Sequence, residues 1–348
     1  MIEPSANSRQ PEWYRQKRVW IGAALLVAVL LLAAYVLRLM QPVRSGVAID
    51  RYVTVKPGDS ASAVGAELKR RGIIRSAWAF DLLSRLGGLA THLTAGTYRL
   101  SPTQSLGSIL AAMKSGDVVV TTVTIPEGYT VKQIVARLLQ AGIGTARQYR
   151  VLEKKPLPGM PKPSPGVRDP LEGYLFPATY QFPYGTTADE ALTTMWDTFE
   201  ARVIRGLYRK GRTKLTLTQW VTLASIVQAE AKNPNQDAAA AAVFLNRLKA
   251  GMPFQSDATV RYAVGHRLLG GLVPADLTTP SPYNTYAHVG FPPGPIANPG
   301  MATLKAAMHP AHVPYLYFVS LRSGRLLFAA TYQQQLANIQ YAKRHPNA

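Results

Sequence analysis

The sequence lacks cysteine, and its carboxy-terminal part contains very few acidic residues. Without cysteine, the chain has neither disulfide bonds nor a thiol nucleophile. Between residues 201 and 348 the only carboxylate side chains are those of Glu230, Asp237, Asp257 and Asp276. Asp237 begins a helical pattern and is predicted to be its N-cap. Acid–base chemistry in this part of the chain therefore has to rely on very few carboxyl groups.

The residue patterns typical of metal and nucleotide sites are also missing. The six histidines are scattered, at His92, His266, His288, His309, His312 and His345. His309 and His312 have no nearby acid or glutamate-bearing helix to complete a zinc site. No glycine-rich phosphate loop follows a predicted strand. The sequence therefore predicts no metal and no other cofactor.

The charge balance is strongly basic. The 348 residues carry a formal net charge of +20, a value that favours anionic partners such as nucleic acid. The lysines and arginines are spread along the chain, however, rather than gathered in one segment. An exported basic protein meets anionic lipid headgroups and anionic wall polymers first, so nucleic acid is not the expected partner.

One long apolar run lies near the amino terminus. From Val19 to Leu37 no charge interrupts a segment long enough to cross a bilayer as a helix. The basic residues before it are Arg9, Arg15, Lys17 and Arg18, and those after it are Arg38, Arg44 and Arg51. Despite the second group, the positive-inside rule favours a cytoplasmic tail (1–18), a transmembrane helix (19–40) and export of the remainder. A cleaved signal peptide is the alternative, but no A-x-A-like cleavage site follows the run.

A weak internal repeat follows. Residues 53–60 and 123–130 each predict an alternating strand and a tight Pro/Gly turn, followed by an amphipathic helix that ends at glycine. Between the two copies, residues 95–100 predict a strand and residues 105–114 a helix. The strand–helix–helix–strand pattern of residues 51–120 resembles LysM modules, which bind glycan chains of the cell wall. A purely structural α/β subdomain is the alternative.

The next two segments are rich in loop-forming residues. Residues 154–167 contain many prolines and glycines, which predicts an extended, flexible surface loop. In residues 169–180, aromatic residues and glycines alternate too densely for a solvated linker. This segment is predicted either to line a cleft or to anchor a turn in the core. Glu172 is an acid of interest here, and a structural hydrogen bond to the backbone is the favoured interpretation.

The central part of the chain, residues 216–251, predicts two helices around a short polar turn. Thr216 and Gln219 have the spacing of a capping box. Apolar residues then recur at helical spacing until the polar turn begins. This helical pair carries the most informative acid of the sequence.

Glu230 lies on the apolar face of the first of these two helices. It is one turn beyond Val227, so its side chain is predicted to point toward the core. Burial raises the pKa of a carboxyl group, which is what a general acid needs. The alternative is an ordinary ion pair of Glu230 with Lys232 or Arg247.

Uncharged polar and aromatic residues dominate three later segments, residues 251–262, 282–286 and 290–300. Sugar sites use such residues, because hydroxyl groups need mixed donors and acceptors and pyranose faces stack on aromatic rings. Specific loops on a rigid scaffold are frequent places for function. Beyond them, residues 315–319 predict a buried strand that pairs with residues 326–330. The predicted fold class is α+β with two lobes.

Five motifs resemble the signature blocks of the endolytic murein transglycosylase family, also called YceG-like. They are LASIVQAEA (223–231), VFLNRLKAGMPFQSDATVRY (243–262), PYNTY (282–286), GFPPGPIANPG (290–300) and YLYFV (315–319). LEGYLFPATY from Leu171, the amino-terminal anchor and the LysM-like region fit the same pattern. The resemblance implies a catalytic domain in residues 121–348. It also implies a single-pass protein of the inner membrane whose carboxy-terminal domain lies in the periplasm.

The resemblance further implies an activity and a catalytic residue. The family's catalytic glutamate is the last acid of the ASIVxxE block, which is Glu230 here. Gln228 stands where many relatives carry a second glutamate. The implied reaction is non-hydrolytic cleavage of the MurNAc–GlcNAc β-1,4 bond within nascent peptidoglycan strands, which leaves 1,6-anhydro-MurNAc ends and terminates strand elongation. Peptidoglycan synthases are implied as partners.

The small number of carboxylates agrees with such a reaction. A retaining hydrolase needs a second carboxylate about 5 Å from the acid and an inverting one needs a base farther away, whereas a transglycosylase can use one acid. Saccharide positioning or transition-state polarisation is expected of Gln255, Ser256, Tyr283, Asn284 and Asn298. Asp257 is expected to orient groups or to bind substrate. For each of these residues, a structural hydrogen bond in a loop is the alternative.

Three other functions stay open at the level of the sequence. The chain could be a non-catalytic glycan-binding scaffold that ties wall synthases to the membrane. It could be a basic membrane-surface protein with no role in the wall. It could also be a muramidase-type hydrolase, with Asp257 or Asp276 as the second carboxylate beside Glu230.

Overall fold

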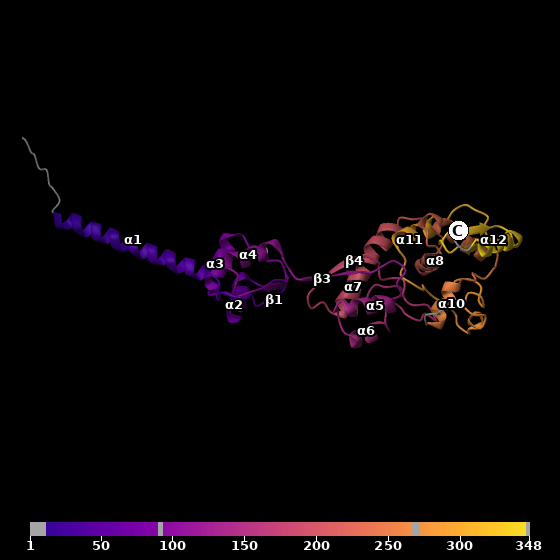
Figure 1. The fold of residues 1–348 in the computed structure, drawn as a ribbon, viewed down its shortest axis with the longest axis horizontal. Helices are drawn as coiled ribbons and strands as arrows, with labels where there is room; N and C mark the ends of the chain where they lie inside the picture. Colours follow the sequence, from indigo (N-terminus) through magenta and orange to yellow (C-terminus); the bar gives the residue numbers. More distant parts are fainter. Residues whose placement is uncertain (1–11, 90–92, 266–271, 346–348) are drawn as a thin grey trace, which may run out of the picture. The chain divides into compact units, whose positions relative to one another are not determined.

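The computed structural model describes residues 12–89, 93–265 and 272–345 (Figure 1). The described residues form helices and short two-stranded sheets, so the predicted α+β class is confirmed. The chain divides into two compact units, residues 1–120 and residues 121–348. Each unit has its own hydrophobic core.

The predicted amino-terminal apolar helix is confirmed. Helix α1 spans Glu12–Met40. Its stretch Ala23–Met40 has a mean hydropathy of 2.5 and is not buried against the rest of the chain. By length and composition this stretch can cross a membrane. A signal sequence can have the same length and composition.

In the first unit, two strands and three helices surround a small core. They are β1 (Arg51–Val55), α2 (Ala61–Arg70), α3 (Ala77–Leu86), β2 (Gly96–Leu100) and α4 (Leu106–Ser115). Strands β1 and β2 are antiparallel, with Val53 opposite Tyr98. Each of the three helices begins at a serine whose hydroxyl accepts a backbone N–H of the first turn, which satisfies one donor that the helix leaves free.

The internal repeat predicted from the sequence is present in the structure. Strand β3 (Val120–Thr124) leads through a tight turn into α5 (Val131–Gln140), as β1 leads into α2. Ser60 and Thr130 occupy the same N-cap position in the two copies. The partners of the two strands differ, because β3 pairs with β4 (Thr179–Pro183) rather than with a strand of its own copy.

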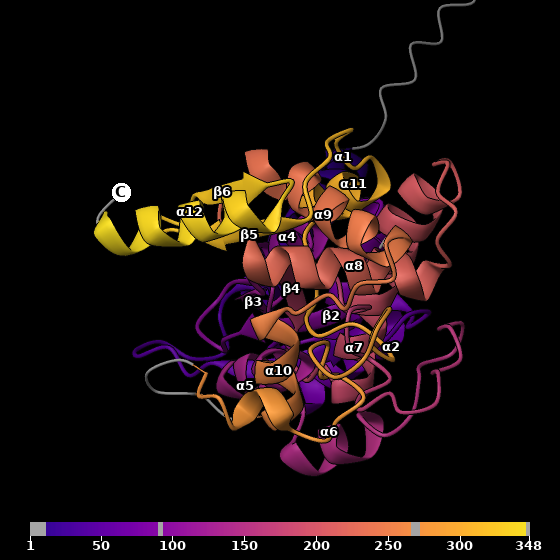
Figure 2. The ribbon, with the colours of Figure 1, turned by 90° about the vertical axis from the view of Figure 1, so that its right-hand side faces the viewer.

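The second unit is mainly helical and is built around one buried helix (Figures 1 and 2). Its remaining elements are α6 (Ala146–Leu152), α7 (Ala188–Phe199), the π-helix η1 (Glu200–Tyr208), α8 (Leu217–Glu230), α9 (Asp237–Lys249), α10 (Asp257–Val264), α11 (Met301–Met308), β5 (Tyr317–Ser320), β6 (Leu326–Ala329) and α12 (Tyr332–Arg344). Short 3₁₀ turns lie at Pro234–Gln236 and Asp276–Thr278. The buried helix is α8, which packs against α9 and α11, and α12 packs on the β5–β6 hairpin.

Helix α8 is fixed at both its beginning and its middle. The predicted capping box of Thr216 and Gln219 is present. Trp220 is completely buried, and its indole N–H donates to the backbone oxygen of Leu304 on α11 at 3.1 Å. Residues 220–227 are all buried. The position of the last residue, Glu230, is therefore set by a well-anchored helix.

The helix after the polar turn differs from the prediction at its start. Asp237 was predicted to be its N-cap, but it is the first residue of α9 and Gln236 holds the N-cap position without a side-chain cap. The 3₁₀ turn Pro234–Gln236 already has helical backbone, so the helix needs no capping carboxylate. Instead, the buried Asp237 Oδ2 accepts a hydrogen bond from Thr303 Oγ1 at 3.1 Å.

Two other predictions need correction. Residues 154–167 contain no helix or strand, as predicted, but Leu157 and Met160 are buried in the main core, so the segment is not purely a surface loop. The predicted strand pair near the carboxy terminus is present and antiparallel. Strand β5 is half-buried rather than buried, because its residues line the cavity described next.

Candidate active site

A cavity of about 330 Å³ lies in the second unit, between the end of α8 and strand β5. Its wall combines charged, amide and aromatic side chains from α8, α9, the loop before α10, the segment around residue 286, and β5. The residues that line it include Glu230, Arg247, Gln255, Asp257, Tyr286 and Tyr317. Three of the sequence-predicted site residues, Glu230, Gln255 and Asp257, are thus brought together here.

Glu230 is the last residue of α8 and is half-buried. Its Oε1 accepts a hydrogen bond from Ser256 Oγ at 2.6 Å and a longer one from the backbone N–H of Ala258 at 3.4 Å. Within the described part of the chain, Glu230 forms no ion pair. The alternative prediction of a pair with Lys232 or Arg247 is therefore wrong.

The environment of Glu230 raises the pKa of its carboxyl group. Burial is the largest cause, and the negative charge of Asp257 acts in the same direction. The hydrogen bonds from Ser256 and Ala258, and the charge of Arg261, lower the pKa and partly offset this effect. The group therefore holds its proton at a higher pH than an exposed glutamate does, while keeping donors that stabilise its ionised form.

The loop that carries Ser256 is held in place by Thr285. The backbone N–H of Gln255 donates to the Thr285 carbonyl, and the backbone N–H of Ser256 donates to Thr285 Oγ1, both at 3.0 Å. Gln255 has φ 52°, in the left-handed region that non-glycine residues rarely adopt. Strain of this kind persists where the surroundings fix the backbone, and it is frequent at functional sites.

Arg247 supports the same loop from α9. It is buried, and its Nη1 donates to the carbonyls of Pro253 and Phe254 and to Gln255 Oε1 at 3.0, 2.8 and 3.1 Å. Its Nε donates to the carbonyl of Leu316 at 2.7 Å. Arg247 thus ties the loop before α10 to the start of the β5 region. The sequence suggested Arg247 only as a partner of Glu230.

Asp257 is the first residue of α10 and lines the cavity. Its Oδ1 accepts a hydrogen bond from the Tyr286 hydroxyl at 2.7 Å. Burial, together with this interaction, raises the pKa of Tyr286, so the phenol stays a donor. Tyr286 was not among the residues predicted for the site, although it is the last residue of the PYNTY motif.

Tyr283 and Asn284 are not among the residues that line this cavity. Asn284 is completely buried, and its amide nitrogen donates to the carbonyls of Leu277 and Thr279 at 2.8 and 3.0 Å. Its amide oxygen accepts the backbone N–H of Tyr286 at 3.0 Å. All of its polar atoms are thus used within its own loop. Tyr283 is also buried, against the ring of Tyr262.

Asn298 and Glu172 form a separate buried group. Asn298 Nδ2 donates to Glu172 Oε1 at 3.1 Å, and Asn298 Oδ1 accepts the backbone N–H of Leu175 at 2.9 Å. Glu172 also accepts the backbone N–H of Val131, at the start of α5. Burial, and then the charge of Asp169, raise the pKa of Glu172 well above its ordinary value. These contacts give Glu172 the backbone hydrogen bond that was favoured for it.

Gln228 likewise makes structural contacts. Its Oε1 accepts hydrogen bonds from the backbone N–H of Gly300 at 2.8 Å and from Thr303 Oγ1 at 3.0 Å. It is not among the residues that line the cavity around Glu230.

Within the described residues, no three His, Asp or Glu side chains gather as metal ligands. His92 and His266 lie outside the described residues.

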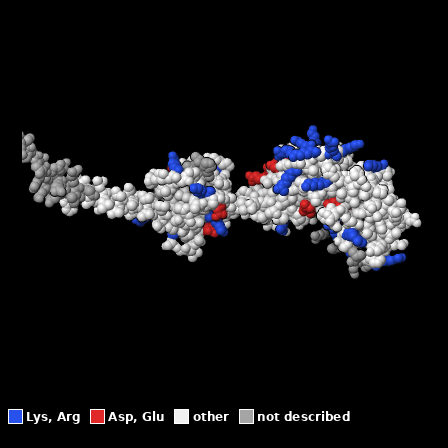
Figure 3. All heavy atoms as spheres, turned by 90° about the horizontal axis from the view of Figure 1, so that it is seen from above, with Lys and Arg blue, Asp and Glu red and all other residues white. Residues whose placement is uncertain are grey.

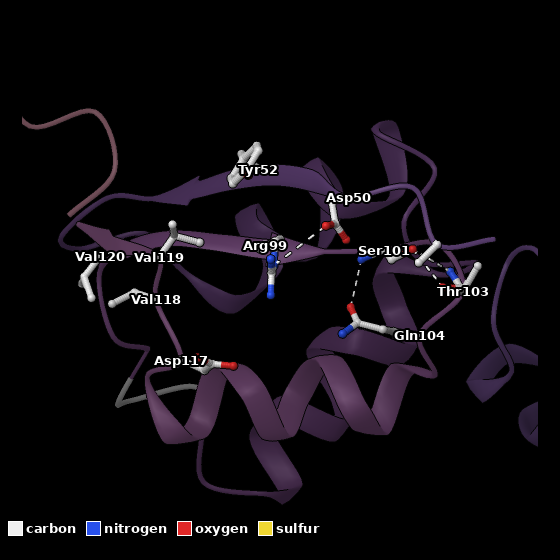
Figure 4. Close-up of a pocket in the computed structure, with 11 residues that line it drawn as sticks. Asp50, Tyr52, Arg99, Ser101, Thr103, Gln104, Asp117, Val118, Val119 and Val120 are labelled. Atoms are coloured by element: carbon white, nitrogen blue, oxygen red, sulfur yellow. Dashed lines mark hydrogen bonds and ion pairs between the residues drawn. The ribbon is translucent and has the colours of Figure 1, made fainter. Parts of the chain in front are cut away.

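A second cavity, of about 520 Å³, lies in the first unit (Figure 4). Its polar lining residues include Asp50, Arg99, Gln104 and Asp117. Arg99 Nε lies 3.9 Å from Asp50 Oδ2. Gln104 Oε1 accepts the backbone N–H of Ser101 at 2.9 Å. Both signs of charge, an amide and hydroxyl groups are thus present around one hollow.

Basic side chains gather on part of the surface of the second unit (Figure 3). The exposed cations of η1 and of the turn after it are Arg202, Arg205, Arg209, Lys210, Arg212 and Lys214. Of these, Arg205 forms an ion pair with Glu200, at 3.2 Å. This surface favours anionic polymers in general.

Three comparisons relate the chain to known proteins. Residues 53–341 match the YceG-like family. A curated relative from Bacillus subtilis (strain 168), named endolytic murein transglycosylase, is 31% identical over 310 residues, which cover 85% of this chain and 86% of the relative. A relative of the same name from Streptococcus pneumoniae serotype 2 (strain D39 / NCTC 7466) is 29% identical and is covered to 60% of its length, by 88% of this chain.

A solved structure has a similar fold. The crystal structure of a YceG-like protein from Listeria monocytogenes is 30% identical in sequence. It matches 84% of this chain and 99% of its own with a TM-score of 0.53.

The raised pKa of Glu230 leads to a prediction for stability. A carboxyl group with a higher pKa in the folded state contributes stability below its unfolded pKa, and this contribution is lost as the pH rises through the folded pKa. We therefore expect Glu230→Gln, which cannot ionise, to gain melting temperature relative to the parent as the pH rises from the ordinary glutamate value of 4.5. Thermal unfolding of both proteins over a series of pH values measures this difference.

The matched control is Glu190→Gln. Glu190 is an exposed capping-box residue whose pKa is lowered by hydrogen bonds from Thr187. The contribution of Glu190 to the stability of the folded state therefore increases as the pH rises, opposite to that of Glu230. Glu190→Gln should lose melting temperature relative to the parent as the pH rises. A pH-independent difference between Glu230→Gln and the parent would contradict the raised pKa.

Proposed function

The chain belongs to the YceG-like family, and we propose that it is an endolytic murein transglycosylase, a lyase with Glu230 as its catalytic acid. Its substrate is the peptidoglycan glycan strand, which it cuts internally at the MurNAc–GlcNAc β-1,4 bond. The name of its curated relatives supports the reaction and the substrate. The assignment of Glu230 is carried by one observation. This carboxyl group, with its raised pKa, lies on the wall of a cavity at the end of a rigidly packed helix.

In the first step, Glu230 donates a proton. Both hydrogen bonds to its carboxyl group use Oε1, so Oε2 is the oxygen that carries the proton. The proton passes to the glycosidic oxygen of the leaving GlcNAc as the bond between that oxygen and C1 of MurNAc breaks. The donor from Ser256 stabilises the carboxylate that remains.

In the second step, the same carboxylate acts as a base. It takes the proton from the C6 hydroxyl of MurNAc as that oxygen attacks C1 and closes the 1,6-anhydro ring. The attack is intramolecular and has a high effective molarity, so no activated water is needed. Glu230 regains its proton, and no second carboxylate takes part.

Asp257 has a supporting role in this scheme. Its Oδ1 is occupied by the Tyr286 hydroxyl, and its charge helps to keep the pKa of Glu230 raised. A muramidase-type hydrolase would instead need Asp257 as nucleophile or base. The two schemes predict different products and different effects of an Asp257 substitution.

We expect the full chain, purified in detergent, to release strands with anhydro-MurNAc ends from purified peptidoglycan. Mass spectrometry of the product ends identifies them, because hydrolysis adds one water that the anhydro product lacks. Glu230→Gln should lower the rate by at least about 10²-fold, since general acid–base catalysis contributes about 10²–10⁴-fold.

Asp257→Asn is the control in the same digestion. In the one-acid scheme it should change the rate by less than about tenfold, because an orienting hydrogen bond contributes about 1 kcal/mol. Hydrated reducing ends, together with a much larger loss on Asp257→Asn, would instead identify a hydrolase. Absence of cleavage by the parent would leave a non-catalytic glycan-binding scaffold.

We also propose that α1 is an uncleaved anchor in the inner membrane and that the residues after it lie in the periplasm. The support is the apolar stretch Ala23–Met40 and the basic residues that precede it in the sequence, since positive charge is kept on the cytoplasmic side. A periplasmic position also places the cavity on the side of the membrane where the wall is built.

The lack of cysteine makes this topology directly testable. In spheroplasts, a membrane-impermeant maleimide should label Ser62→Cys, at an exposed position on α2. It should label Ser8→Cys only after the membrane is permeabilised. Labelling of Ser8→Cys alone in intact spheroplasts would mean the reverse orientation, and labelling of both variants would contradict a membrane-spanning anchor. Loss of the amino terminus from the mature mass would indicate a cleaved signal peptide.

We further propose that the first unit is LysM-like and binds glycan. The resemblance of residues 51–120 to LysM modules supports this proposal, and so does the polar cavity around Arg99 and Gln104 (Figure 4). Mixed donors and acceptors suit the hydroxyl and amide groups of glycan. A purely structural subdomain would have no need of such a hollow.

Sedimentation with purified sacculi tests this binding. In the Glu230→Gln background, Arg99→Gln should lower the bound fraction at about 0.15 M salt, where surface charge is screened beyond about 8 Å. Arg70→Gln is the matched control, since Arg70 is an exposed arginine of the same unit outside the cavity. Equal losses for the two variants would mean that charge alone holds the protein to the wall.

A further inference from the structure

Arg247 is a buried cation without a carboxylate partner in the described part of the chain. Its four hydrogen bonds go to three backbone carbonyls and to the amide oxygen of Gln255. The ring of Tyr317 lies 5.2 Å from the guanidinium carbon. Neutral dipoles and a ring face compensate a buried charge only in part, because the loss of hydration is large.

One nitrogen of the guanidinium group is still available. All the hydrogen bonds use Nε and Nη1, and Nη2 has no partner among the described residues. The buried side-chain atoms that lack partners are Ser84 Oγ, Thr222 Oγ1 and Gln335 Oε1. Nη2 is not one of them, so it is exposed to solvent, and Arg247 lines the cavity around Glu230. A fixed guanidinium group with free donors is suited to bind an anion.

We propose that Arg247 binds a carboxylate carried by the 3-O-lactyl branch of MurNAc and thereby sets which sugar lies over Glu230. The inference rests on the proposed function, since it names the part of the murein strand that this site recognises. GlcNAc is uncharged, and every carboxylate of murein is on this branch. The carboxylate is either the lactyl group itself, on bare strands, or a group of the stem peptide.

The charges of the cavity favour this placement. Glu230 and Asp257 line the same cavity. The Asp257 carboxylate repels an anion from its part of the wall, and the protonated Glu230 carries no charge that would attract one. Arg247 is the cation among the lining residues. A strand with carboxylates on alternate sugars therefore has one favourable register, in which the branch meets Arg247.

The experiment measures binding to three kinds of strand. The protein is the full chain in detergent with Glu230→Gln, so that no strand is cut during the measurement. The strands are bare glycan with free lactyl carboxylates, the same glycan with these carboxylates blocked as methylamides, and glycan with stem peptides. Titration calorimetry gives the affinities, and the blocked strand should bind at least about tenfold more weakly than a carboxylate-bearing one, as expected for hydrogen bonds to a charged group.

The two carboxylate-bearing strands identify the source of the anion. Tighter binding of bare strands points to the lactyl carboxylate, and tighter binding of peptide-bearing strands points to the stem peptide. Equal affinity of the blocked strand and both others would overturn the proposal. Because cleavage is not measured, this result is independent of whether the parent forms anhydro ends.

Substitution of Arg247 then assigns the preference to this residue. In the same background, Arg247→Gln should bind the blocked and carboxylate-bearing strands with affinities within about twofold of each other, whereas Arg247→Lys should keep part of the difference. Arg261→Gln, which removes a nearby exposed charge outside the cavity lining, should keep all of it.

Arg247 also holds the loop before α10, so folding is checked by thermal unfolding. The comparison is a ratio of affinities within one variant, which a uniform loss of stability does not change. If Arg247→Gln is unfolded, the affinities of Arg247→Lys for the blocked and the carboxylate-bearing strands are compared instead. A preference for carboxylate that survives in a folded Arg247→Gln protein would overturn the proposal.

Discussion

The hydrogen bond from Ser256 to Glu230 is the interaction on which the candidate site depends. It joins the end of the buried helix α8 to the start of α10, at 2.6 Å. Burial raises the pKa of Glu230, and the donors at the start of α10 limit that rise. One group can therefore be a proton donor in one step and a stabilised carboxylate in the next. Thr285 and Arg247 hold the loop before α10, and so keep Ser256 in place.

Much of the fold follows from local sequence signals. The capping box at Thr216, the repeated strand, turn and helix that follow residues 53 and 123, and the β5–β6 hairpin were all predicted, because the relevant interactions are between neighbours in the sequence. The position of Glu230 on the apolar face of α8 was also visible from its spacing. The wrong predictions concern side chains whose partners are distant in the sequence. Asp237 is an example, because its carboxylate accepts a hydrogen bond from Thr303 on α11.

The same distinction applies to the site. The motifs drew attention to Gln255, Ser256 and Asp257, and the structure places Gln255 and Asp257 on the cavity wall and Ser256 in contact with Glu230. Composition could not separate them from Asn284 and Asn298, which have the same polar character. These two amides use their polar atoms to fix buried loops. Tyr286 and Arg247 were missed because their roles arise from contacts across the fold.

The scarcity of acidic residues connects the surface with the chemistry. Lysine and arginine outnumber aspartate and glutamate by 39 to 19, and basic side chains gather on part of the second unit (Figure 3). An anionic polymer is attracted to such a surface over distances near the Debye length. Acids scattered over this surface would weaken that attraction. The carboxyl groups of the cavity, Glu230 and Asp257, are instead held by specific donors. An enzyme that gathers a carboxylate-rich strand and protonates it at one bond needs both features, a basic surface and a few positioned acids.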